Sequence, residues 1–456
     1  MTTLVILTAL SLVCLFSEIF GFKKVLHILV LAGLTAALSA AVLDWNTDKV
    51  YFNDMVRMDN YSLAFTGLII SLSILWFIMS PRFFDEPSSK TDHYALILFS
   101  IIGVQLMASF SNMLILFLGI EILSICMYVL AGSRKSDLNS NEASLKYLLL
   151  GAFATGFLLF GITLIYGVTG SFQVSKIAEY FGQSGSSSPL AFAGILLMFT
   201  AMAFKVSAVP FHFWAPDVYQ GSPTVITAFM STVVKTAAFA ALFRLFHVSF
   251  ESISESWSTM VWIISAATIL LGNITAVYQK NFKRMLAYSS ISHAGYMLMA
   301  VLALTPSSSS SLLFYATAYS ISSICSFAVL LAISRSGGNE SIAAFRGMAK
   351  TNPFLATVTV VAMLSLAGIP PLAGFFAKYY IFSSAIQAGY TNLVLIAILG
   401  SLIGVFYYFR IIIALFEKES ETTSIPLNFS FQAILLLTAV AALILGIAPG
   451  LLTDLI

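Results

Sequence analysis

Four ionisable side chains lie deep inside apolar stretches of the sequence. They are one carboxylate and three lysines, namely Glu121, Lys205, Lys235 and Lys378. A charge at the centre of a membrane-spanning helix costs roughly 2.5–3.5 kcal/mol, so such residues persist where they pair with one another or carry protons. Burial makes a lysine release its proton more easily, and a nearby carboxylate makes it hold that proton. We therefore predict a proton relay with a movable contact between Glu121 and Lys205.

A static ion pair between Glu121 and one lysine, which only holds two helices together, is the structural alternative. It accounts for one lysine and leaves two without a role, so the sequence favours the relay. Three further residues are candidates for the same relay, namely Lys146, His212 and His293. Each also has a structural explanation, because histidines among apolar residues are often hydrogen-bonded core residues and a lysine at a helix end can extend to the membrane surface.

The elements that must position these residues are long apolar segments. Of the 456 residues, 59% are hydrophobic and 9% are charged, which is more apolar surface than a water-soluble core could bury. A membrane span needs about 20 mostly apolar residues. We therefore predict an all-α polytopic membrane protein with about fourteen spans, near 2–21, 25–43, 61–80, 93–109, 112–131, 145–168, 190–210, 223–246, 258–278, 285–304, 311–333, 354–384, 391–416 and 429–452. The longest polar stretches, 44–60, 170–188 and 417–428, are short enough to be loops.

Two of these spans are broken by prolines, at Pro210 and at Pro370-Pro371. Broken helices at matching positions in two halves indicate inverted repeats around an ion site near the membrane midplane. Lys205 lies five residues before the first break and Lys378 seven residues after the second. We predict two inverted five-helix repeats, the fourth to eighth and the ninth to thirteenth spans, and divide the chain into 1–92, 93–250, 251–416 and 417–456, the last holding the final helix.

The basic residues in the loops predict the orientation of the chain in the membrane, and the net charge and the cysteines limit its possible partners and cofactors. Loops after even-numbered spans hold only four basic residues, Lys49, Arg57, Lys176 and Arg244, so the other loops are expected on the cytoplasmic side and both termini on the opposite side. Because Lys23-Lys24 follow the first apolar stretch instead of preceding it, we expect a retained helix and not a cleaved signal. The net charge of +2 indicates no acidic partner, and the aromatic residues, 14% of the chain with Phe the most frequent, suit contact with lipid better than stacking on nucleic acid. Cys14, Cys126 and Cys325 lack the spacing of disulfide, metal or iron–sulfur sites, so we expect no cofactor or metal in this chain.

Three long strings give the chain a resemblance to a known family. They are Phe204–Thr224 (FKVSAVPFHFWAPDVYQGSPT), Lys280–Tyr296 (KNFKRMLAYSSISHAGY) and Gly368–Lys378 (GIPPLAGFFAK). With these strings the sequence resembles, over nearly its whole length, the antiporter-like subunits of respiratory complex I and of multisubunit cation/proton antiporters. The resemblance implies that Glu121 and Lys205 are the family's central pair, that Lys235 links two half-channels and that Lys378 leads to the far side.

The resemblance also implies a place in a larger assembly. Within complex I, the largest antiporter-like subunit adds a lateral helix and the middle one usually carries glutamate at the position of Lys378, whereas this chain has a lysine and ends at Ile456 after its last predicted span. It therefore resembles the remaining member, a proton-translocating but non-redox subunit of an NADH:quinone oxidoreductase. Expected partners are a second antiporter-like subunit, small membrane subunits and the lipid of a bacterial inner membrane. The complex would use FMN, iron–sulfur clusters, NADH and a quinone.

Two alternatives to this function stay open at the level of sequence. One is a subunit of a multisubunit sodium/proton antiporter, without NADH chemistry. The other is an assembly platform in which the buried charges have lost their role.

Overall fold

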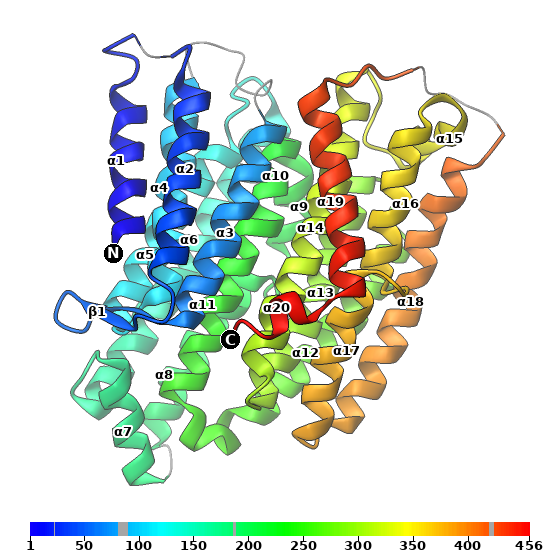
Figure 1. Ribbon diagram of the computed structural model, residues 1–456. Coiled ribbons are helices and arrows are strands. Elements are labelled where there is room, and N and C mark those ends of the chain that lie inside the picture. Colours follow the sequence, from blue (N-terminus) through cyan, green and yellow to red (C-terminus); the bar gives the residue numbers. More distant parts are fainter. Residues whose placement is uncertain (22, 81–89, 186–187, 419–423) are drawn as a thin grey trace. The chain divides into compact units, whose positions relative to one another are not determined.

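The protein is seen in a computed structural model that describes residues 1–21, 23–80, 90–185, 188–418 and 424–456. Almost all of the described chain is helical (Figure 1). The helices of the first half are α1 (Thr2–Phe16), α2 (Leu26–Leu43), α3 (Asn60–Met79), α4 (Lys90–Ser109), α5 (Met113–Ala131), α6 (Leu138–Thr169), α7 (Val174–Ser184), α8 (Pro189–Val206), α9 (Trp214–Gly221), α10 (Thr224–Phe229), a π-helical turn (Met230–Val234) and α11 (Lys235–Ser249). Those of the second half are a 3-10 turn (Glu251–Ile253), α12 (Ser254–Val277), α13 (Phe282–Ala303), α14 (Ser308–Arg335), a 3-10 turn (Ile342–Phe345), α15 (Met348–Thr351), α16 (Pro353–Ala367), α17 (Ala373–Gln387), α18 (Thr391–Leu415), α19 (Phe429–Ile447) and α20 (Gly450–Thr453).

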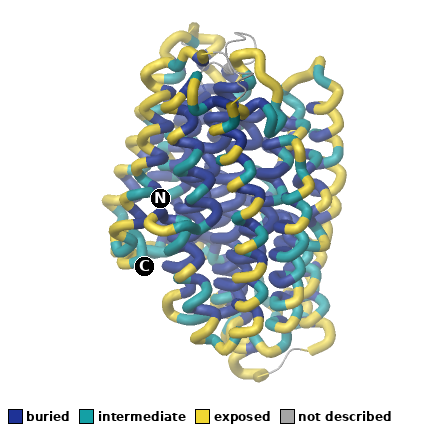
Figure 2. The backbone as a smooth tube through the Cα atoms, turned by 90° about the vertical axis from the view of Figure 1, so that its right-hand side faces the viewer, coloured by how far each residue is buried: buried dark blue, intermediate teal, exposed yellow. Residues whose placement is uncertain are grey.

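The prediction of an all-α polytopic membrane protein is confirmed. Within the described residues, 12 helical segments are long and apolar enough to cross a membrane, and α1 and α16 are shorter apolar helices. Those two short helices correspond to predicted spans, and the number of about fourteen spans stays a prediction. Figure 2 shows the buried residues along helix faces that meet other helices, with exposed residues on loops and outward faces.

Two of the polar stretches that the sequence indicated as loops contain regular structure. The first holds a hairpin of β1 (Lys49–Tyr51) and β2 (Val56–Met58), which pair antiparallel with Lys49 opposite Met58. The second holds α7, which buries Val174, Ile177 and Phe181 on one face. That spacing of three and four residues is the pattern of an amphipathic helix, which a search for long apolar runs does not detect.

The helices gather into two compact units. The first contains Met1–Val206 and Val233–Val261, and the second contains Ser207–Thr232 and Trp262–Leu455. The first unit therefore carries Glu121, Lys205 and Lys235, and the second carries His212, His293 and Lys378. The predicted division into two inverted repeats with the ranges given above stays a prediction.

A close approach between two helices of the first unit fixes the position of α5. A Cβ atom added to Gly103 of α4 would lie 2.7 Å from the backbone oxygen of Gly119 in α5, and one added to Gly119 would lie 2.8 Å from the backbone oxygen of Gly103. Only glycine fits such contacts, and small residues let membrane helices pack backbone to backbone. Because Gly119 precedes Glu121 by two residues, this contact sets the direction of the α5 face that carries the carboxylate.

Both predicted helix breaks are present. After α8 ends at Val206, Ser207 adopts a left-handed backbone conformation with φ 62°, and the Val209-Pro210 bond is cis before α9 begins at Trp214. After α16 ends at Ala367, Gly368 is left-handed with φ 85° and the Pro370-Pro371 bond is cis before α17 begins at Ala373. Each break leaves backbone groups without the partners of a continuous helix, and side chains can satisfy them.

Candidate functional site

Lys205 lies at the end of α8, and its ammonium group contacts the side of α5. The side chain is 6% exposed, and its Nζ donates a hydrogen bond to the hydroxyl of Ser124 at 2.5 Å. The Ser124 hydroxyl in turn donates to the backbone oxygen of Ile120, one turn earlier in its own helix. Ser124 therefore presents a lone pair to the lysine, and both groups are hydrogen-bonded despite their burial.

Glu121 lies one helical turn from Ser124 on the same face of α5. Its carboxylate interacts electrostatically with the Lys205 ammonium, but these two described side chains do not form a direct ion pair. Residues three apart on a helix have Cβ atoms about 5–6 Å apart. The observed arrangement is thus one in which the lysine is displaced from the carboxylate by one turn, and the movable contact predicted from the sequence stays a prediction.

Tyr128 completes this face of α5 on the other side of Ser124. Its ring centroid is 5.7 Å from the Nζ of Lys205, within the range of a cation–π interaction. The Tyr128 hydroxyl packs where only glycine fits, since a Cβ atom on Gly151 of α6 would lie 2.0 Å from it. Lys205 therefore has two neutral partners, a hydroxyl and an aromatic ring, next to a carboxylate.

Lys235 is the first residue of α11 and follows the π-helical turn Met230–Val234. The side chain is 2% exposed. Single π-helical turns inside α-helices are rare and occur often at functional sites. The structure thus places the second lysine of the predicted relay at a local widening of its helix, in the interior of the protein.

Lys378 lies in α17, one and a half turns after the second break. Its Nζ donates to the backbone oxygen of Ala367 at 2.7 Å and to the hydroxyl of Ser401 in α18 at 2.8 Å. The ring centroid of Tyr296 lies 5.5 Å from the same Nζ. Ala367 is the last residue of α16, so the lysine satisfies one of the carbonyl groups that a helix end leaves open. A cation there is also stabilised by the helix dipole.

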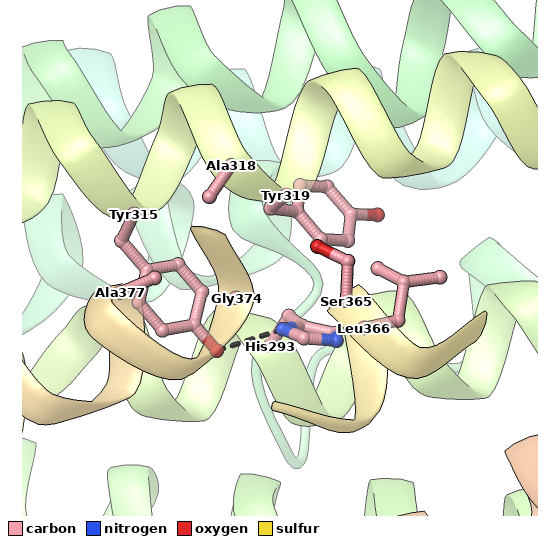
Figure 3. Close-up of a pocket in the computed structure, with 8 residues that line it drawn as sticks. All are labelled: His293, Tyr315, Ala318, Tyr319, Ser365, Leu366, Gly374 and Ala377. Carbon is pink, nitrogen blue, oxygen red and sulfur yellow. Dashed lines mark hydrogen bonds between the residues drawn. The ribbon is translucent and has the colours of Figure 1, made fainter. Parts of the chain in front are cut away.

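His293 of α13 bridges two tyrosines beside a small cavity. Its Nδ1 is 2.7 Å from the hydroxyl of Tyr315 and its Nε2 is 3.1 Å from that of Tyr408, which also contacts the hydroxyl of Ser289. Figure 3 shows His293, Tyr315 and Tyr319 around this cavity. An imidazole between two hydroxyls is a satisfied core group and also a group that could pass a proton, so the two interpretations of His293 remain open.

His212 lies in the turn between α8 and α9 and is 4% exposed. Its ring packs on that of Phe213 with centroids 4.4 Å apart. Among the described residues, no hydrogen-bond partner contacts its Nδ1. A buried polar atom in this state is suited to holding a water molecule, which keeps His212 a candidate for the relay.

Lys146 differs most from the other candidates. The sequence placed it at the start of a span, whereas α6 begins at Leu138 and Lys146 lies in its third turn. Its side chain is 40% exposed and pairs with Glu142 at 2.7 Å, four residues earlier in the helix. Lys146 is therefore part of a surface ion pair. Its role at the entry to the relay stays a prediction.

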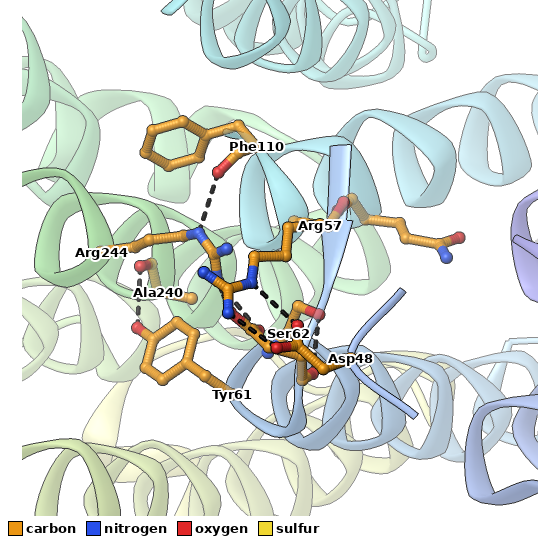
Figure 4. Close-up of polar contacts among 10 residues, drawn as sticks. Asp48, Arg57, Tyr61, Ser62, Phe110, Ala240 and Arg244 are labelled. Carbon is orange, nitrogen blue, oxygen red and sulfur yellow. Dashed lines mark hydrogen bonds and ion pairs between the residues drawn. The ribbon is translucent and has the colours of Figure 1, made fainter. Parts of the chain in front are cut away.

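The structure adds a charged cluster that sequence reasoning did not find. Arg244 of α11 is 6% exposed and pairs with Asp59 at 2.9 Å. It also donates to the backbone oxygen of Phe110 at 2.9 Å (Figure 4). Asp59 also accepts from the backbone nitrogen of Ser62 and so caps α3. This cluster ties α3 and α4 to α11, the helix that carries Lys235.

The serines that hold the two lysines were also missed. Serines in membrane helices commonly bond to their own backbone, so Ser124 and Ser401 carry no signal in the sequence that separates them from the many other serines. Within the described residues, no group of three His, Cys, Asp or Glu side chains is placed to hold a metal ion, and the three cysteines are free and buried.

Comparisons with known proteins place this geometry in a family. A family model described as "NADH:quinone oxidoreductase/Mrp antiporter, TM" matches residues 110–404. The chain is 47% identical over 455 residues to NADH-quinone oxidoreductase subunit N of Cytophaga hutchinsonii, an alignment that covers 99% of this chain and 98% of that one. It is similar to a chain of respiratory complex I from Thermus thermophilus, solved with bound aureothin, with a TM-score of 0.84, 32% identity and coverage of 99% and 98%. It also matches a chain of the Mrp complex from Dietzia with a TM-score of 0.88, coverage of 99% and 95%, and 22% identity, which shows a shared fold.

Proposed function

Because the chain belongs to the NADH:quinone oxidoreductase/Mrp antiporter membrane family, we propose that its buried lysines carry protons across the membrane in an NADH:quinone oxidoreductase. The observation that carries the proposal is the burial of three lysines, Lys205, Lys235 and Lys378, at 6%, 2% and 7% exposure. Charges so deep in a membrane protein mark ion pathways in general. The energy comes from quinone reduction elsewhere in the complex.

The Glu121–Lys205 pair is the switch in this proposal. When the carboxylate and the lysine are close, the lysine holds its proton, and when they separate, the buried lysine releases it. The proton passes through water to Lys235 and then to Lys378, from which it leaves. His212 and His293 serve as intermediate stations and Lys146 serves at the entry.

The relatives support the assembly and the location that we propose for the chain. The chain is an integral multi-pass membrane protein. We place it in a bacterial inner membrane with both termini on the non-cytoplasmic side, beside a second antiporter-like subunit and small membrane subunits. FMN, iron–sulfur clusters, NADH and the quinone belong to the complex, and none is assigned to this chain.

The relatives favour this function over the sodium/proton antiporter. The relative with 47% identity is named as a subunit of NADH-quinone oxidoreductase, whereas the resemblance to the Mrp chain rests on the fold. Proton pumping in the presence and absence of sodium separates the two functions, because an antiporter couples proton movement to the sodium gradient.

The proposal is tested in assembled complexes that carry Lys205→Ala or Lys378→Met. We expect NADH oxidation to continue while protons pumped per NADH fall, because each variant interrupts the relay. Lys176→Ala, at a lysine of the short surface helix α7, is the matched control and should pump normally. Undiminished pumping per NADH in Lys205→Ala would remove that lysine from the path, and assembly without pumping would exclude a purely structural role for the buried charges.

A further inference from the structure

We propose that Ser124 and Tyr128 form a neutral docking site that holds protonated Lys205 away from Glu121. The proposal deepens the proton-relay function and rests on it. It defines where the lysine goes when its contact with the carboxylate opens, which the sequence left without an answer.

The geometry at Ser124 fits an acceptor for an ammonium group. The hydroxyl proton is directed at the backbone oxygen of Ile120, so the remaining lone pairs of Ser124 face Lys205 at 2.5 Å. The Tyr128 ring adds a second neutral partner at 5.7 Å. Together they stabilise a buried cation without a negative charge, by a hydrogen bond and a cation–π contact.

The spacing on α5 makes the docking site and the carboxylate competitors. Glu121, Ser124 and Tyr128 follow one another at three and four residues, so they lie on one face of the helix. Lysine has a flexible four-carbon stem, and a shift of about 5 Å takes its ammonium from the hydroxyl to the carboxylate. Lys205 can therefore exchange partners by side-chain rotation, without movement of α5 or α8.

Ser124 acts through Lys205 and is a positioning residue. Without its hydroxyl, the lysine is left with Glu121 as its best partner, and the pair stays closed. A closed pair holds the proton to higher pH. Removal of the Ser124 hydroxyl should therefore slow pumping and shift its pH profile. A residue that only fills space would change neither quantity.

The test compares Ser124→Ala with Ser124→Thr in the assembled complex. We expect Ser124→Ala to pump about tenfold more slowly, since one hydrogen bond to a charged group is lost, and to move the alkaline limb of the pH profile to higher pH. Ser124→Thr keeps a hydroxyl and should pump normally. Ser73→Ala is the matched control, because Ser73 is also buried and donates to a backbone oxygen of its own helix, that of Ile69 at 2.7 Å.

The possible results separate this proposal from the function on which it rests. Native rate and pH profile in Ser124→Ala, together with loss of pumping in Lys205→Ala, would overturn the docking site and leave the relay intact. Equal losses in Ser124→Ala and Ser124→Thr would also overturn it, since the hydroxyl would then be irrelevant. If Ser124→Ala fails to assemble, Ser124→Cys replaces it, because a thiol fills the same place and is a weak acceptor; native pumping in that variant would overturn the proposal.

Discussion

Buried cations are held differently in the two compact units. In the first unit, two of them have a carboxylate nearby, because Arg244 pairs with Asp59 and Lys205 interacts electrostatically with Glu121. In the second unit, carbonyl oxygens near the ends of helices are partners of three cations, one of which, Lys283, also pairs with Glu340 at 3.4 Å. These contacts are Lys378 to Ala367, Lys283 to Gln220 and Ser222, and Arg410 to Val277 and Gln279.

The difference has a chemical consequence. A carboxylate can lose its charge by taking a proton or lose its effect by moving away, whereas a backbone carbonyl at a helix end keeps its dipole at every pH. Lys205 thus has a nearby partner that can be switched, whereas Lys378 has a backbone partner that is fixed. On this view, the drive for proton movement acts at Glu121, and Lys378 responds to the proton that reaches it.

Removal of the Glu121 carboxylate is expected to have the largest effect on pumping. Glu121→Gln leaves Lys205 among neutral groups, as Lys378 is now, so the first unit should lose its switch. We expect pumping per NADH to fall about tenfold or more, because a unit charge a few ångströms away in the protein interior is worth at least about 1.4 kcal/mol. Glu18→Gln, which removes the exposed partner of Lys23, is the control and should pump normally. Native pumping in Glu121→Gln would break the comparison, since a fixed set of partners would then suffice.

The structural ion pairs of the two units extend the comparison to stability. Asp59→Asn keeps the cap of α3, because asparagine also caps helices, but it leaves the buried Arg244 without its counter-charge. We expect the free energy of unfolding of Asp59→Asn to be lower by about 3 kcal/mol. Glu340→Gln should cost about 1 kcal/mol or less, because Lys283 keeps its two backbone oxygens and its contact with Glu340 is 3.4 Å long. The fraction of the chain that stays in the complex after heating measures the stability of both variants. Equal losses of stability would contradict the division into switchable and fixed partners.

Sequence reasoning found the charges of this system but not the groups that hold them. The spans, both helix breaks and the buried positions of Lys205, Lys235 and Lys378 follow from long apolar runs, prolines and the cost of a charge in a membrane. The start of α6 was missed because its first turn, capped by Asp137, is polar, and hydropathy does not register polar helical turns. Ser124 and the carbonyl of Ala367 were missed for a deeper reason. Contacts between distant helices depend on how those helices pack, and a hydroxyl or a backbone oxygen looks the same in sequence whether or not a lysine lies against it.

Ser401→Ala tests the comparison at its smallest expected effect. It removes one hydrogen bond from Lys378, as Ser124→Ala removes one from Lys205, but the backbone oxygen of Ala367 remains at 2.7 Å and cannot be deleted by a side-chain substitution. No carboxylate among the described residues pairs with Lys378, so this lysine should stay at the end of α16. We therefore expect pumping to fall by about twofold at most, with an unchanged pH profile. Rates of proton uptake in liposomes containing each variant complex measure the ratio between the two serine substitutions. A loss in Ser401→Ala as large as that in Ser124→Ala would mean that the fixed carbonyl does not hold Lys378, and the distinction between the two units would fail at the residue on which it most depends.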